Sequence, residues 1–199
     1  TLGRIQKIKI GAKQIAVTAL LLAICIISQF FKNLSVFITG PIINVCLLLA
    51  VLTAGLAAGI ILSVITPVTS FFIAGSPVMA ALPAIIPFIM CGNIVLVVAF
   101  NYLMKKDLTD SADGLKKFMT YVKAVVCSLL KGAFMGLTIS LWLLPTFLPK
   151  VLPAESPLLS KMGAFQMTFS LFQFLTALIG FVYLFIIWAV LRKTLNRES

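Results

Sequence analysis

A single lysine, Lys131, stands inside an apolar stretch that reads CSLLKGAFMGLTISLWLLP from Cys127 to Pro145. A lysine at the centre of a membrane helix costs roughly 2.5–3.5 kcal/mol on insertion scales. The apolar stretches of the chain contain no aspartate or glutamate that could neutralise it. Two interpretations stay open. The side chain extends along its helix toward the cytoplasmic surface, or it meets backbone carbonyls, water, a lipid headgroup or an anionic ligand.

Polar side chains follow one face of the last apolar stretch. Gln166, Ser170 and Gln173 recur there at helical spacing, opposite a face of leucine, phenylalanine and isoleucine. Unpaired amides are costly in hydrocarbon, so this face is expected to point into a helix bundle or a cavity. Hydrogen bonds between helices and the polar wall of a ligand pocket explain it equally well. Asn44 and Asn93 are candidates for the same wall.

Two aromatic residues lie near the predicted outer ends of their helices. Phe72 and Trp142 either anchor the protein at the membrane interface or stack on a ring of the ligand. With them the predicted substrate-binding set is complete. It consists of Asn44, Phe72, Asn93, Lys131, Trp142, Gln166, Ser170 and Gln173.

Four alanines form a narrow stripe along the first apolar stretch. Ala12, Ala16, Ala19 and Ala23 follow one another at positions i, i+4, i+7 and i+11. Small residues at this spacing let a second helix approach closely within lipid. The stripe therefore predicts either packing inside the bundle or a docking surface for another membrane protein.

Groups that could perform catalysis or drive transport are missing from the sequence. There is no histidine, no cysteine pair at a metal-ligand spacing and no GxxxxGK[ST] phosphate-binding loop. Coupling to protons or cations commonly uses intramembrane carboxylates or histidines, and none occurs here. We therefore expect no enzyme activity, no metal site and no cofactor. The chain is expected to bind a molecule without supplying energy for its movement.

The composition indicates an integral membrane protein. Of 199 residues, 61% are hydrophobic and 11% are charged, against about 25% charged in a soluble domain. The net charge of +11 does not indicate nucleic acid, because twelve of the sixteen lysines and arginines fall into three clusters. These lie at residues 4–13, 105–123 and 192–197. Such clustering is typical of cytoplasmic segments between membrane helices.

Counting crossings between the basic clusters predicts an all-α membrane protein with six transmembrane helices and both termini in the cytoplasm. The expected helices span about residues 14–31, 41–57, 59–74, 83–104, 119–144 and 166–191, in a single substrate-binding domain covering 1–199. The outward segments 32–41 and 144–163 are expected to be structured loops, because four prolines interrupt the second of them.

These features resemble the S-components of energy-coupling factor transporters, the membrane subunits that bind vitamins for import. The resemblance is carried by the alanine spacing, by "FKNLSVFITGPIINVCLLLA" and by "GSPVMAALPAIIPFIMCGN". It implies a micronutrient pocket on the outer side, roofed by the loop between helices one and two. It also implies that Ala12/Ala16 or Ala19/Ala23 dock to a transmembrane coupling subunit, which works with two cytoplasmic ATPases. Nickel and cobalt members use an N-terminal histidine, so metal uptake is not expected here.

The missing intramembrane carboxylates also narrow the ligand class. A strongly cationic vitamin would find no buried counter-charge, whereas a neutral or anionic, partly aromatic molecule suits Lys131, the amides and the aromatic residues. Besides this ligand, the expected surroundings are membrane lipid in a bacterial plasma membrane, without nucleic acid. Two alternatives stay open: a small secondary carrier that acts alone, and an assembly subunit without a pocket.

Overall fold

The computed structural model describes residues 11–31, 35–110 and 114–195, and the described residues are helical with short connections. The longer elements are α1 (Ala12–Gln29), α2 (Val36–Thr53), α3 (Leu56–Ala74), α5 (Ile85–Leu103), α7 (Phe118–Met135), η2 (Gly136–Leu143), α8 (Leu144–Val151), α10 (Met162–Phe169) and α11 (Leu171–Leu195). The shorter ones are α4 (Pro77–Ala81), α6 (Lys105–Thr109), η1 (Gly114–Lys116) and α9 (Pro157–Ser160).

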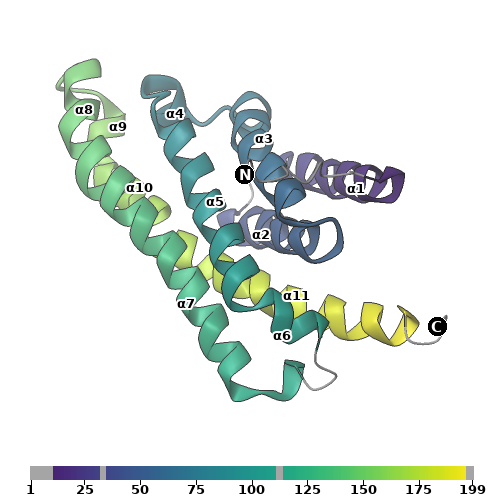
Figure 1. Cartoon of the computed structure of the whole chain (residues 1–199). Helices are drawn as coiled ribbons and strands as arrows, with labels where there is room; N and C mark the ends of the chain where they lie inside the picture. The colour runs from purple at the N-terminus through teal and green to yellow at the C-terminus, as the bar shows by residue number, and fades with distance from the viewer. Residues whose placement is uncertain (1–10, 32–34, 111–113, 196–199) are drawn as a thin grey trace, which may run out of the picture.

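Six helical stretches in the described residues are long and apolar enough to cross a membrane, which confirms the predicted fold class. Four are the single helices α1, α2, α3 and α5. The fifth runs through α7, η2 and α8 over 34 residues, and the sixth through α10 and α11. Figure 1 shows α4, α8 and α9 gathered at one end of the bundle, named here the α4 end. The other end, named the α6 end, carries α6 and the close of α11.

Several predicted boundaries were displaced. The second helix begins at Val36 rather than residue 41, because the Ser35 hydroxyl accepts a hydrogen bond from Phe37 N and caps it. Pro41 therefore lies inside the helix. The division between the expected helices 41–57 and 59–74 falls earlier, at Ala54 and Gly55, and Gly55 takes a φ of 100° that favours glycine.

The fifth span contradicts the prediction of a loop from residue 144 onward. It continues as α8 to Val151 and includes Pro145 and Pro149. The preceding segment η2 is a π-helix. Local changes of this kind allow proline in membrane helices, because other groups then bond the backbone atoms that the proline leaves unpaired. The basic residues Arg4, Lys7 and Lys9 lie outside the described residues, as does part of the predicted roof loop, residues 32–34.

Glycines allow close contacts between helices. A Cβ atom added at Gly180 of α11 would lie 2.8 Å from Asn44 Cβ, and one at Gly40 of α2 would lie 2.8 Å from Thr176 Cγ2. At Gly132 of α7 it would lie 2.7 Å from Phe174 Cβ. Small residues at these positions bring α2, α7 and α11 together, as in other membrane bundles.

The α6 end is closed by polar contacts. Lys123 Nζ lies 2.5 Å from Asp107 Oδ2, and Trp188 Nε1 donates a hydrogen bond of 3.1 Å to the Leu108 carbonyl. Thr120 Oγ1 donates to the Gly114 carbonyl at 2.7 Å. These bonds attach α6 and η1 to α7 and α11.

Candidate functional site: a cavity with a buried lysine

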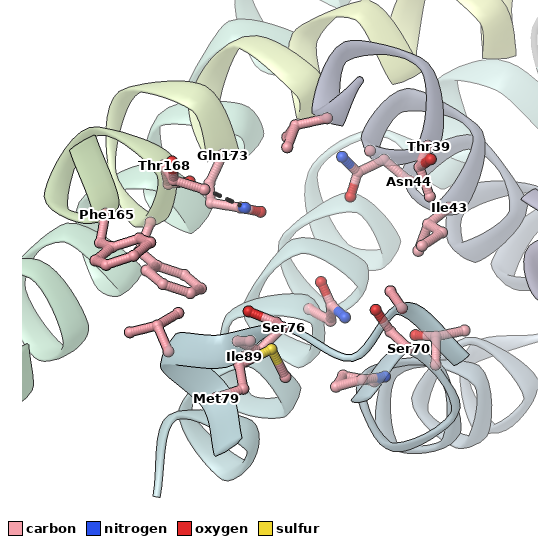
Figure 2. Close-up of a pocket in the computed structure, with 18 of the residues that line it drawn as sticks. Thr39, Ile43, Asn44, Ser70, Ser76, Met79, Ile89, Phe165, Thr168 and Gln173 are labelled. Carbon is pink, nitrogen blue, oxygen red and sulfur yellow. Dashed lines mark hydrogen bonds between the residues drawn. The ribbon is translucent and has the colours of Figure 1, made fainter. Parts of the chain in front are cut away.

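A cavity of about 600 Å³ opens in the half of the bundle nearest α4. Its walls come from α2, α3, α4, α5, α7, α10 and α11, so all the long helical spans except α1 contribute. Figure 2 shows Ser70, Ser76, Asn44 and Gln173 around the open centre, with Asn44 and Gln173 entering from opposite sides. This volume lies within the range of small-molecule sites, about 300–1,000 Å³.

Lys131 lies at the deep end of the cavity. Its side chain is 3% exposed, and Nζ donates hydrogen bonds to Asn44 Oδ1 at 2.6 Å and Asn93 Oδ1 at 2.8 Å. The interpretation in which Lys131 extends to the cytoplasmic surface is therefore wrong. Its partners are two side-chain amides, which the sequence placed only in a possible pocket wall.

Helix packing explains how these three residues meet. Asn44 and Asn93 each lie eight residues after the start of α2 and α5, about 12 Å along the helix. Both side chains are buried, at 1% and 4% exposed. The close approach at Gly40 and Gly180 brings Asn44 against α11, where Asn44 Nδ2 lies 3.5 Å from Thr176 Oγ1. The cluster thus joins α2, α5, α7 and α11.

The predicted polar face of the sixth span is divided in two by a break at Ser170. This residue ends α10 with φ −121° and ψ −87°, and its Oγ donates to the Gln166 carbonyl at 2.5 Å. Gln166 binds η2, because Gln166 Nε2 donates to the Ser140 carbonyl at 3.0 Å and Ser140 Oγ donates to the Gln166 carbonyl at 2.8 Å. Neither Gln166 nor Ser170 lines the cavity. Gln173 does, with Nε2 donating to the Thr168 carbonyl at 3.2 Å.

The two predicted aromatic residues lie outside the cavity lining. Phe72 is 77% exposed on α3. Trp142 is half exposed and makes edge-to-face contacts with Phe88 and Phe147. The aromatic residues that do line the cavity are Phe165 and Phe169 of α10, which no feature of the sequence had distinguished from other apolar residues.

Other lining residues were also missed from the sequence. Thr39 and Ser70 contribute hydroxyls, and Met79 and Ile89 contribute apolar surface. Serine, threonine and methionine are common in membrane helices, so their types carried no signal. Their shared position became visible only when α2, α3, α4 and α5 were placed around one space.

The alanine stripe lies on the outside of the bundle. Ala12, Ala16, Ala19 and Ala23 are all exposed, and α1 is the least buried of the six spans at 22%. A second groove, of about 530 Å³ and mainly apolar, separates α1 from the start of α3, and Ala19 lines it. This face is available to another helix or to lipid.

Six helical spans, five of which line a cavity with both polar and apolar walls, define a class, that of multi-pass membrane proteins with a site for a small molecule. The model of the family "ECF transporter, substrate-specific component" matches residues 13–191. The chain therefore belongs to that family, as the resemblance in the sequence indicated. No curated protein and no solved structure matches it.

Membership of this family determines the general role of the chain. It is a substrate-binding component of an energy-coupling factor transporter, a transporter subunit rather than a member of an enzyme family. Such components work with a membrane coupling subunit and with ATPases.

Proposed function

We propose that this chain captures a vitamin or related micronutrient from outside a bacterial cell. A coupling subunit and two ATPases would then deliver the molecule inward. The observation that carries the proposal is the cavity that ends at Lys131, a buried cation held by Asn44 and Asn93. Charged side chains within a membrane bundle are costly and usually mark a substrate pathway or a binding site.

The distribution of basic residues supports an outward-facing cavity. Lys105, Lys106 and Lys117 lie at the α6 end, and the first and last spans also begin or end there with Lys13 and Arg192. Segments rich in lysine and arginine stay in the cytoplasm. The cavity lies toward the opposite end, and would therefore open to the outside.

The exposed face of α1 supports docking to the coupling subunit. Its four alanines offer a shallow surface on which a partner helix could pack closely. None of the six spans contains an aspartate or glutamate, so the chain has no carboxylate with which to couple transport to cations. The energy for import would come from the ATPases.

The test is in two stages. The chain is purified with its coupling subunit and ATPases, and released small molecules are identified by mass spectrometry. Uptake of the identified molecule is then measured in proteoliposomes with ATP inside. We expect uptake by the complete complex and none by the chain alone.

Other results would support a different function. ATP-independent uptake by the chain alone would show a secondary carrier. The absence of any released molecule together with the absence of uptake would indicate an assembly subunit.

A further inference from the structure

We propose that the ligand of this cavity carries one carboxylate, which accepts hydrogen bonds from Lys131 and Asn93 at the deep end. An apolar, ring-sized body would lie between α4 and α10. This inference rests on the proposed function, because it names the chemical class of the molecule that the same cavity binds.

The first argument is the uncompensated charge. Lys131 has no carboxylate partner among the described residues. Asp107 is paired with Lys123 at the α6 end, and Glu155 lies in the exposed turn before α9. A buried charge is tolerated when it is paired, so a ligand that brings one negative charge would neutralise the site.

The second argument is the orientation of the two amides. An ammonium group offers only donors, so the oxygens of Asn44 and Asn93 must face Lys131. Their NH₂ groups consequently point away from it. Asn93 Nδ2 has no hydrogen-bond partner among the described residues, and Asn44 Nδ2 has only the 3.5 Å contact with Thr176.

The hydrogen-bond donors left unused at the deep end indicate which ligand group could bind there. The ammonium has three N–H groups, and the two asparagines use two of them. One N–H of Lys131 and both N–H groups of Asn93 remain. These groups can only donate, so they select a ligand group that only accepts. A carboxylate has two such oxygens and a single charge, whereas a phosphate dianion would leave an excess negative charge buried.

The third argument is the change in polarity along the cavity. Toward α4 and α10 the walls include Met79, Ile89, Phe165 and Phe169. Figure 2 shows Phe165, Met79 and Ile89 on the side away from Asn44, with the hydroxyl residues Ser76 and Thr168 near them. A ligand with an acidic end and an apolar body fits this gradient when it enters acid first.

The experiment uses benzoate as the probe, because it joins a carboxylate to one ring. Benzamide has the same shape without the charge, and benzylammonium has the opposite charge. Thermal unfolding of the purified full chain in detergent is followed with each compound at millimolar concentration. We expect benzoate to raise the melting temperature by about 2 °C or more, and the other two compounds to leave it unchanged.

Two variants connect the effect to the cavity. Lys131→Met removes the charge. Asn93→Asp keeps the shape and the contact with Lys131 but supplies an internal carboxylate, so it remains informative if Lys131→Met does not fold. Both should lose the stabilisation by benzoate. Lys150→Met, which removes an exposed lysine outside the cavity, should keep it.

The proposal is overturned if benzoate has no effect, if benzamide stabilises equally, or if the benzoate effect persists in Asn93→Asp. Any of these results leaves the transport function intact when the complete complex still imports a molecule with ATP. Failure of that import instead removes the proposed function, whatever benzoate does.

Discussion

The helices α1 and α2 are both 18 residues long and both apolar, yet they occupy opposite environments. Mean hydropathy is 1.7 for α1 and 2.3 for α2, but 22% of α1 is buried against 61% of α2. The small residues of α2 face other helices of the chain, as Gly40 faces Thr176. The small residues of α1 are the four alanines of the stripe, Ala12, Ala16, Ala19 and Ala23, and they are exposed on the outside of the bundle. Similar apolar helices can therefore serve either the internal core or an external surface.

The largest effect should follow from filling the contact between α2 and α11. In Gly180→Ala the new methyl group would lie 2.8 Å from Asn44 Cβ and 3.3 Å from the Pro41 carbonyl oxygen. Overpacking of this kind costs about 1–3 kcal/mol, so thermal unfolding in detergent should occur at a clearly lower temperature. Gly163→Ala is the matched control, because no atom lies within 4 Å of its added Cβ. Equal melting temperatures for the two variants would contradict this description of the interface.

An effect of comparable size should come from the polar cluster that α2 shares with α5 and α7. Asn44→Leu removes one acceptor from Lys131 and should cost about 1–3 kcal/mol, because a buried donor loses its partner. Adding Lys131→Met should recover part of that loss. A double-mutant cycle of unfolding free energies measures this coupling. Strictly additive costs would show that the 2.6 Å contact contributes nothing to stability.

Substitutions in the alanine stripe of α1 should leave the unfolding free energy of the isolated chain almost unchanged. Ala16→Leu and Ala19→Leu lie on the exposed face, so the stability of the isolated chain should change by less than about 0.5 kcal/mol. Co-purification with the coupling subunit should nevertheless fall, since bulky side chains prevent close helix approach. Ala164→Leu, at an exposed position of α10, is the control. Unchanged assembly in both α1 variants would remove the docking proposal.

The smallest effect is expected at Phe72. It is 77% exposed and outside the cavity, so Phe72→Ala should change the affinity for the identified ligand by less than about twofold. Phe169→Ala removes cavity wall and should weaken binding considerably more. Isothermal titration of both variants checks this order. A reversed order would place the ligand on the outside of α3.

The sequence predicted the type of fold better than the limits of its elements. Six spans were predicted because long apolar runs and clusters of lysine and arginine are local properties of the chain. The start of α2 and the continuation into α8 were missed, because Pro41, Pro145 and Pro149 indicated breaks. Proline in a membrane helix is allowed when neighbouring groups take over the lost backbone bonds, and those groups belong to the tertiary structure.

The candidate site was predicted in part. Asn44, Asn93, Lys131 and Gln173 stood out as polar residues in apolar stretches, and all four line the cavity. Gln166 and Ser170 had the same signal, but they bond η2 and their own helix. Spacing on one helix cannot separate these cases, because the break at Ser170 turns the two halves of the polar face toward different neighbours.

By itself the sequence determined that this chain has six stretches apolar enough to cross a membrane, and that one of them contains Lys131 while none contains a carboxylate. This was possible because hydropathy and charge are properties of each residue and of its neighbours along the chain, and do not depend on tertiary contacts. The tertiary structure alone decided that Asn44 and Asn93 hold Lys131, since three helices distant in sequence must pack before their side chains can meet.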